Sequence, residues 1–151
     1  MPVDFSVVIP VFNEEENIPE LYRRLTAQME KLGAYEIILV DDGSSDASWQ
    51  FIKELHKGDS RVKGLSFSRN FGHHIALSAG LDYAKGSTII LMDADMQDPP
   101  DEVPRLIEKF RENYDIVYGI RKTRHDSIFK RMTSALFWVT LKRFSGVPLF
   151  T

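Results

Sequence analysis

The chain has 151 residues, 43% of them hydrophobic and 27% charged, with a formal net charge of −3. This size and balance suit one globular domain with its own core, and they exclude disordered, collagen-like and low-complexity chains. The chain has no cysteine, which excludes a disulfide framework, a thiolate metal site and a cysteine nucleophile. No basic segment precedes the first apolar run, so we expect no signal peptide and a domain exposed to the cytosol.

Apolar runs alternate with amphipathic segments along most of the chain. In chain order, the sequence predicts a strand over residues 5–11, a helix from 14 to 33, a strand over 35–40, a helix around 49–55, a strand over 62–68, a helix over 75–84, a strand over 87–92, a helix over 102–113 and a strand over 115–118. Strands that are continuous apolar runs and alternate with helices indicate parallel pairing with both faces covered. The sequence therefore predicts an α/β fold, with a mainly parallel, Rossmann-like sheet and helices on both faces.

Residues 127–144 are predicted to form a basic amphipathic helix. Residues 1–104 contain 9 Lys and Arg against 18 Asp and Glu, whereas residues 105–151 contain 10 against 4. The longest uncharged stretch of the helix, residues 132–141, is far shorter than the roughly 20 residues that span a bilayer. We expect this helix either to cover the sheet or to lie at a membrane interface, where its basic residues would meet phosphates or anionic lipids. Its charges could equally form a solvated face.

Polar residues follow the carboxyl end of each predicted strand, which is where parallel α/β sheets bind their ligands. They are Asn13 and Glu14, Asp41 and Asp42, Arg69 and Asn70, Asp93 with Asp95 and Gln97, and Arg121. Two carboxylates about 5 Å apart repel by roughly 3 kcal/mol at an effective dielectric of 20. A bound Mg²⁺ or Mn²⁺ would remove that repulsion between Asp93 and Asp95, because both ions prefer oxygen ligands. The alternative is a solvated Asx turn, and the expected nearness of Asp41 and Asp42 favours the cation.

Several other functional classes lack their motifs. No G-x-G-x-x-G follows the first strand and no G-x-x-x-x-G-K-[ST] occurs, which disfavours dinucleotide oxidoreductases and P-loop NTPases. No serine lies in a G-x-S-x-G elbow, which disfavours nucleophilic hydrolases. His73 and His74 are adjacent and do not share a helix face, so we expect them to pack at a loop or a helix start rather than to bind a metal.

Five segments, taken together and in order, resemble family 2 glycosyltransferases of GT-A fold. They are VIPVFNEE at 8–15, VDDGSSD at 40–46, SRNFGH at 68–73, ALSAG at 76–80 and MDADMQDPP at 92–100. More narrowly, they are similar to polyprenyl-phosphate glycosyltransferases, such as bactoprenol glucosyltransferases and dolichol-phosphate mannose synthases. The resemblance covers nearly the whole chain and implies a single GT-A domain over residues 1–151.

The resemblance also implies roles for the residues that match the family's motifs. The implied nucleoside contacts are Pro10, Asn13, Glu14 and Asp42. Asp93 and Asp95 would bind the Mg²⁺ or Mn²⁺ ion, and Gln97 would complete or orient that metal site. The implied phosphate-binding residues are Arg121, Arg131 and Ser134, in the basic part of the chain.

The implied reaction is an inverting, metal-dependent transfer of a hexose from a nucleotide sugar, with UDP-glucose preferred, to a polyprenyl phosphate at the cytoplasmic face of a membrane. GDP-mannose or a UDP-linked modified pentose stays open as the donor, and a sugar hydroxyl stays open as the acceptor. A non-catalytic nucleotide-binding module is the third interpretation. No nucleic acid is expected as a partner, and composition does not decide the oligomeric state.

Family relatives continue past the position of Thr151 into a G-D-F-R segment and often into transmembrane helices. We therefore expect this chain to be the donor-binding part of a longer, membrane-anchored protein, and we expect nucleotide binding from it rather than turnover.

Overall fold

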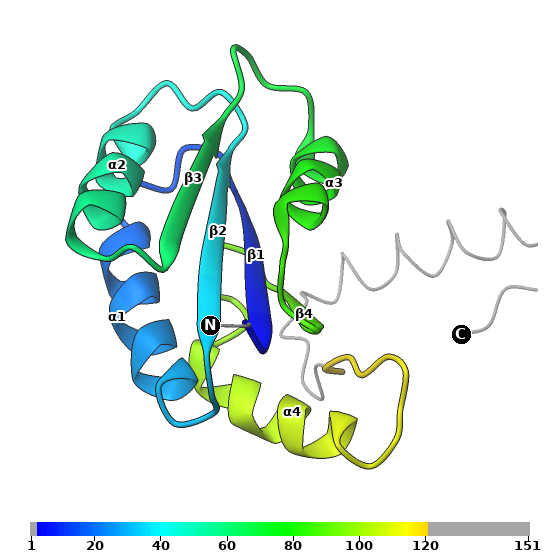
Figure 1. Cartoon of the computed structure of the whole chain (residues 1–151). Helices are drawn as coiled ribbons and strands as arrows, with labels where there is room; N and C mark the ends of the chain where they lie inside the picture. Colours follow the sequence, from blue (N-terminus) through cyan, green and yellow to red (C-terminus); the bar gives the residue numbers. More distant parts are fainter. Residues whose placement is uncertain (1–2, 121–151) are drawn as a thin grey trace, which may run out of the picture. The chain divides into compact units, whose positions relative to one another are not determined.

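The computed structural model describes residues 3–120, and the unit that ends at Val117 is described here by itself. Its sheet has four strands, all parallel, in the order β3-β2-β1-β4 (Figure 1). The elements in chain order are β1 (Phe5–Val11), α1 (Ile18–Met29), β2 (Tyr35–Asp41), α2 (Ser48–Gly58), β3 (Val62–Ser66), α3 (His73–Tyr83), β4 (Thr88–Leu91), the 3-10 helix η1 (Pro100–Glu102) and α4 (Val103–Phe110).

The two central strands, β1 and β2, are buried along their whole length. They pair from Phe5 with Tyr35 through Val11 with Asp41, so their carboxyl ends are level. Successive side chains of a strand point to opposite faces of the sheet. Residues such as Val7 and Ile37 therefore pack with α1, α2 and α4, whereas Val8 packs with α3 on the other face. Figure 1 shows α1 and α2 on one side of the sheet and α3 on the other, which confirms the predicted α/β arrangement.

One helix begins later than its sequence pattern suggests. The acidic run from Glu14 forms a turn, and α1 begins only at Ile18. The backbone N–H of Glu14 donates to Ser48 Oγ at 2.9 Å, and that of Glu15 donates to Asp46 Oδ2 at 3.1 Å. Because these two amides bind side chains at the start of α2, the segment that follows β1 is held against the segment that follows β2.

The predicted strand over residues 115–118 is wrong. No strand is assigned there, and the sheet of the described residues ends at β4. The apolar composition of the segment gave it strand propensity, but a strand also needs a neighbour to pair with and a face to bury. The Ile116 side chain is 80% exposed, so the segment lacks the burial that would make pairing favourable.

The predicted basic helix over residues 127–144 lies outside the described residues. Between residues 3 and 120, no helix has the length and apolar character needed to cross a membrane.

Candidate functional site

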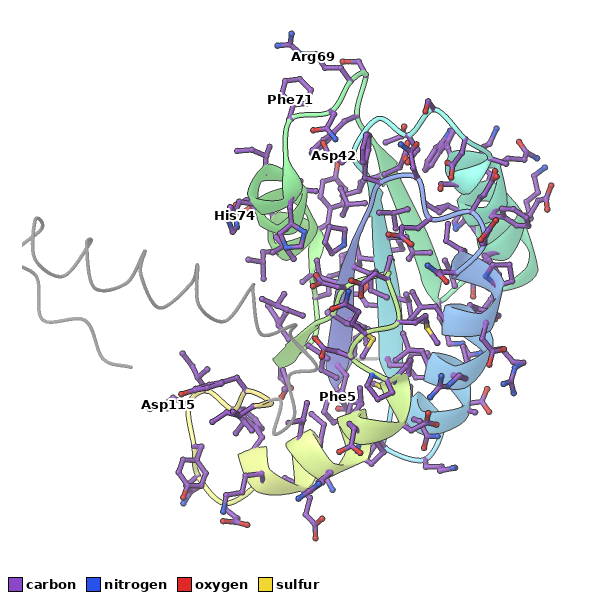
Figure 2. The ribbon with its side chains drawn as sticks, turned by 180° about the vertical axis from the view of Figure 1, so that it is seen from behind. Phe5, Asp42, Arg69, Phe71, His74 and Asp115 are labelled. Carbon is purple, nitrogen blue, oxygen red and sulfur yellow. The ribbon has the colours of Figure 1, made fainter. Side chains whose placement is uncertain are left out.

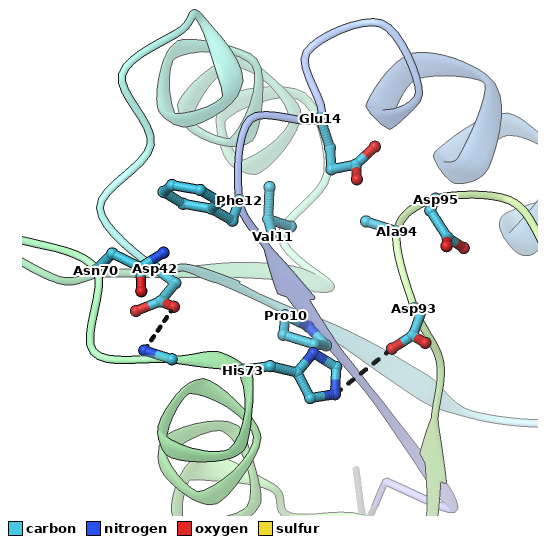
Figure 3. Close-up of a pocket in the computed structure, with 11 residues that line it drawn as sticks. Pro10, Val11, Phe12, Glu14, Asp42, Asn70, His73, Asp93, Ala94 and Asp95 are labelled. Carbon is cyan, nitrogen blue, oxygen red and sulfur yellow. Dashed lines mark hydrogen bonds and ion pairs between the residues drawn. The ribbon is translucent and has the colours of Figure 1, made fainter. Parts of the chain in front are cut away.

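A pocket of about 330 Å³ lies at the carboxyl edge of the sheet (Figure 3). Four chain segments form it, and each lies at or just beyond the carboxyl end of a strand. The lining residues are Pro10, Val11, Phe12, Glu14, Asp42, Asn70, Gly72, His73, Asp93, Ala94 and Asp95. Parallel strands bring their carboxyl ends to one edge, which is why residues more than 80 positions apart in sequence meet here. Five of the residues implied by the sequence, Pro10, Glu14, Asp42, Asp93 and Asp95, lie together in this pocket.

Asp42 holds the chain segment that leads into α3. Its side chain is buried, and its two carboxylate oxygens accept the backbone N–H groups of Phe71 at 2.8 Å and Gly72 at 2.9 Å. The next residue, Gly43, has φ +70°, and a Cβ there would lie 2.3 Å from the backbone carbonyl carbon of Arg69. The segment after β2 is therefore fitted closely against the segment before α3, and Asp42 sets where that helix begins.

Figure 2 shows Arg69 and Phe71 extending past the end of the sheet above Asp42. The Arg69 guanidinium lies 4.8 Å from the centre of the Phe71 ring, and Phe67 meets the same ring edge-on at 5.5 Å. Because these contacts and the two hydrogen bonds to Asp42 act on one short stretch, they fix the position of the neighbouring Asn70 in the pocket wall.

Asn13 lies outside the set of residues that line the pocket. It has φ +55°, and its side-chain oxygen accepts the backbone N–H of Ser45 at 2.8 Å, while its own N–H donates to Ser44 Oγ at 3.0 Å. The Asn13 side chain therefore ties together the segments that follow β1 and β2. Its neighbour Glu14 lines the pocket and accepts a hydrogen bond from Asn17 Nδ2 at 2.6 Å.

The acidic segment after β4 forms the opposite wall. Asp93 and Asp95 line the pocket on either side of the buried Ala94, and Figure 3 shows the Asp93 carboxylate pointing toward His73. Asp95 Oδ1 accepts the backbone N–H of Gln97 at 3.0 Å, and Met96 between them has φ +59°. Gln97 is exposed and lies outside the lining set, and its backbone N–H is the donor to Asp95.

The far end of the acidic segment is anchored to α1. Asp101 in η1 accepts hydrogen bonds from Arg24 Nε at 2.9 Å and from Gln28 Nε2 at 2.9 Å. The hydrogen bond from Arg24 holds the pKa of Asp101 below its ordinary value. The segment is thus fixed at both ends, by β4 and by Asp101.

The donor set suits a hard divalent cation. Asp93 and Asp95 present carboxylates to the pocket, and the Asp93 side chain is 49% exposed. Within residues 3–120, no three His, Asp or Glu side chains converge closely enough to hold a metal by themselves. An ion at Asp93 and Asp95 would therefore take its other ligands from water or from a bound phosphate, as Mg²⁺ commonly does.

His73 is a pocket residue that the sequence pattern did not identify. It begins α3, two residues before the helix predicted over 75–84, and this agrees with the helix-start alternative given for it. It also lines the pocket, and its Nε2 lies 3.7 Å from Asp93 Oδ1. The adjacency of His73 and His74 argued against a metal site formed by the pair, but it did not exclude a pocket role for His73 alone. The signal that could have found His73 is its position at the start of the helix that follows β3, because such helix starts face the ligand-binding edge of a parallel sheet. Phe12 also lines the pocket and was not identified from the sequence. The signal that could have found it is its position directly after β1, at the same edge of the sheet.

Arg121, Arg131 and Ser134 lie outside the described residues, so phosphate binding by these three stays a prediction.

The model of the family described as "Glycosyl transferase family 2" matches residues 6–148. An "Uncharacterized glycosyltransferase YkcC" of Bacillus subtilis (strain 168) is 43% identical over 149 residues, which are 97% of this chain and 46% of that protein. An "Undecaprenyl-phosphate 4-deoxy-4-formamido-L-arabinose transferase" of Salmonella paratyphi A is 46% identical over 143 residues, which are 93% of this chain and 44% of that protein. The chain thus spans less than half the length of these curated relatives.

Solved structures share the fold. Glucosyl-3-phosphoglycerate synthase from Mycobacterium tuberculosis, solved with Mn²⁺, UDP and glucosyl-3-phosphoglycerate, is 25% identical with a TM-score of 0.55, over 72% of this chain and 39% of that chain. TarS 1–349 of S. aureus in complex with UDP-GlcNAc is 23% identical with a TM-score of 0.56, over 72% of this chain and 32% of that chain. Both likenesses confirm the fold predicted from the sequence.

Proposed function

Because the chain belongs to glycosyl transferase family 2, we propose that it is the donor-binding part of an enzyme that transfers a sugar from a nucleoside diphosphate to a polyprenyl phosphate. The observation that carries the proposal is the meeting of Glu14, Asp42, Asp93 and Asp95 around one pocket at the carboxyl edge of the sheet. Two comparisons support it: the name of the Salmonella relative specifies undecaprenyl phosphate, and the mycobacterial synthase was solved with UDP and Mn²⁺.

The nucleoside would occupy the side of the pocket formed by β1 and β2. Pro10 and Glu14 line that side, and Asp42 closes it. The Phe12 side chain is 46% exposed and offers an aromatic face on which a base can stack. In this arrangement Asn13 acts indirectly, because its side chain fixes the loop that carries Phe12 and Glu14.

The diphosphate would lie toward Asp93 and Asp95, on the β4 side. These two carboxylates would hold Mg²⁺ or Mn²⁺, and the backbone of Gln97 would orient Asp95. A bound cation would supply neutralisation of the charge that develops on the departing nucleoside diphosphate.

The acceptor phosphate would attack carbon 1 of the sugar directly and invert its configuration. The bond from that carbon to the diphosphate oxygen breaks, and its electron pair leaves with the nucleoside diphosphate. A phosphate monoester is largely ionised near neutral pH, so the step needs positioning more than a strong general base. Arg121, Arg131 and Ser134 are the residues proposed to bind the lipid phosphate. The basic excess of residues 105–151 suits an anionic cytoplasmic membrane surface.

For the donor we propose a UDP-sugar, with UDP-glucose first. The second candidate is a UDP-linked modified pentose, which the name of the Salmonella relative favours because it specifies a formamido-arabinose.

The test is calorimetric titration of the 151-residue chain with UDP and with GDP, each in the presence of Mn²⁺ and of a chelator. We expect UDP to bind, and to bind more tightly with Mn²⁺. An Asp93→Asn chain should keep the weaker, chelator-resistant binding and lose the gain from Mn²⁺. Binding of GDP in preference to UDP would contradict the donor assignment, and binding of neither nucleotide would contradict the proposal as a whole.

A further inference from the structure

The N-terminal end of α3 contacts both walls of the pocket. On one side the N–H of Gly72 donates to Asp42, and on the other side His73 approaches Asp93; Figure 3 draws both interactions. These two α3 contacts come from consecutive residues. The start of this helix therefore lies between the side of the pocket proposed for the nucleoside and the side proposed for the cation.

The backbone that carries His73 is held in place. Gly72 has φ +103°, and its carbonyl accepts the N–H groups of Ile75 at 3.0 Å and Ala76 at 3.2 Å, which starts the helix. Farther along α3, Gly80 lies so close to the sheet that a Cβ there would meet Val8 Cγ1 at 2.3 Å. Because the helix is packed this tightly, the His73 side chain projects from a fixed point.

From that point the imidazole reaches the acidic wall. Its Nε2 is 3.7 Å from Asp93 Oδ1, and each of the two side chains is 49% exposed. This separation is longer than the roughly 2.9 Å of an ordinary N–H···O hydrogen bond, so a hydrogen bond requires the two atoms to approach by less than about 1 Å. Groups that hydrogen-bond a metal-binding carboxylate set its orientation, and their loss typically lowers metal affinity about 10- to 100-fold.

We propose that His73 is a positioning residue for Asp93, holding one oxygen of this carboxylate so that the other faces the pocket and is ready for a divalent cation. This inference rests on the proposed function, in which Asp93 binds that cation. It gives α3 a second task besides covering the sheet: the same helix start that Asp42 fixes also orients the acidic wall.

The test measures Mn²⁺ binding to the 151-residue chain by electron paramagnetic resonance, without nucleotide and at one pH. The variants are His73→Ala, which removes the imidazole, and His73→Gln, which restores a neutral N–H donor. His74→Ala is the matched control, because His74 is the next residue of α3 and lies outside the lining set. UDP affinity in chelator and thermal unfolding by circular dichroism are measured for all of them.

We expect His73→Ala to weaken Mn²⁺ binding about tenfold, His73→Gln to recover most of that loss, and His74→Ala to bind Mn²⁺ as the unaltered chain does. UDP affinity in chelator and the unfolding temperature should stay the same throughout. Unchanged or tighter Mn²⁺ binding by His73→Ala would overturn the inference. So would a directly coordinated imidazole nitrogen in pulsed spectra of the Mn²⁺ complex, because His73 would then be a ligand.

Measurements on the unaltered chain separate a failure of the role of His73 from a failure of the proposed function. If it binds UDP and Mn²⁺ and His73→Ala behaves identically, only the role of His73 fails. If the unaltered chain binds UDP but does not bind Mn²⁺, the cation site and the role of His73 both fail while nucleotide binding stands. If it binds neither, the proposed function fails with them.

Discussion

Glu36, at the amino end of the sheet, and Asp93, just beyond its carboxyl end, have opposite surroundings. At the amino end, Glu36 is buried, and its Oε1 accepts hydrogen bonds from Ser6 Oγ at 2.6 Å and from the backbone N–H of Lys85 at 2.7 Å. Lys63 pairs with its other oxygen. Burial raises the pKa of Glu36, but the bonds from Lys63, Ser6 and Lys85 outweigh burial and hold it below the ordinary value.

At the carboxyl end, Asp93 has half of its side chain in solvent and a histidine at 3.7 Å. A buried and fully bonded carboxylate contributes to holding the strands together, whereas a carboxylate left partly open can take a ligand. Charge alone therefore does not mark the site. Glu36 and Asp93 both sit on or next to strands of the same sheet, and the number of bonds already made to each separates their roles.

The largest effect expected is at the amino end. Replacing Glu36 with Ala removes the buried partner of an ion pair whose Lys63 side chain is 34% exposed. It leaves Lys63, Ser6 Oγ and the Lys85 N–H without their acceptor, which should lower the free energy of unfolding by about 3 kcal/mol. Urea denaturation measures it. Glu20→Ala, which breaks an exposed pair with Arg23, is the control and should change stability by less than about 0.5 kcal/mol. A Glu36→Ala loss no larger than that of the control would show that the bonds to Glu36 do not stabilise the amino end of the sheet.

The hydrogen bonds of a second carboxylate near the amino end, Asp59, should make the free energy of unfolding depend on pH. The hydrogen bond from Arg61 lowers the pKa of Asp59 to about 2, from 3.8. Because the folded pKa is the lower one, the stabilisation is present above pH 3.8 and is lost as pH falls toward 2. Asp59→Asn should therefore cost about 2 kcal/mol near pH 6, and that cost should shrink steadily between pH 4 and 2. A cost that is constant with pH would show that the charge of Asp59 is not its source.

At the carboxyl end, replacing Asp93 should reduce ligand binding and leave stability intact, whereas replacing Glu36 should reduce stability. Asp93→Asn is expected to lower Mn²⁺-dependent UDP affinity at least about tenfold, because it removes a charged oxygen ligand. Its free energy of unfolding should stay the same or rise slightly, since the change also relieves repulsion from Asp95. Calorimetry and urea denaturation on one preparation measure both. A variant that loses stability along with binding would place Asp93 in the same structural class as Glu36.

The smallest effect is expected at a neutral buried group, the hydroxyl of Tyr35. The Tyr35 hydroxyl is buried and finds no hydrogen-bond partner within the described part of the chain. Burial raises the pKa of Tyr35 to about 12, from 10.0. Because the folded pKa is the higher one, ionisation of Tyr35 leaves the free energy of unfolding unchanged below pH 10 and lowers it as pH rises from 10 through 12. Tyr35→Phe should stabilise the fold by less than about 1 kcal/mol at pH 7, and the gain should grow at pH 11. A loss of stability at pH 7 would mean that the hydroxyl is bonded.

Much of this arrangement follows from sequence pattern. Apolar runs located β1, β2 and β4, and the convergence of parallel strand ends brought Glu14, Asp42, Asp93 and Asp95 to one pocket. Pattern fails where a residue's partner is set by the folded chain. The strand expected over residues 115–118 needed a neighbour that its own composition could not reveal.

The same limit applies to side chains. Asn13 was expected in the nucleoside pocket because it matches a motif of the family, yet its oxygen accepts an N–H from Ser45 in another loop. Gln97 meets the acidic pair through its backbone, and that contact has no residue signature. His73 faces Asp93 only because α3 starts where Asp42 makes it start.

The hold of Asp42 on the segment before α3 has a consequence for how this pocket can evolve. Asp42 accepts the backbone N–H groups of Phe71 and Gly72. Almost any residue at position 71 would present the same N–H group. Position 70 lies in the pocket wall and is not itself part of that hold. The side chain at position 70 can therefore be exchanged without releasing the loop, so changes in what the pocket prefers can accumulate while its frame stays the same.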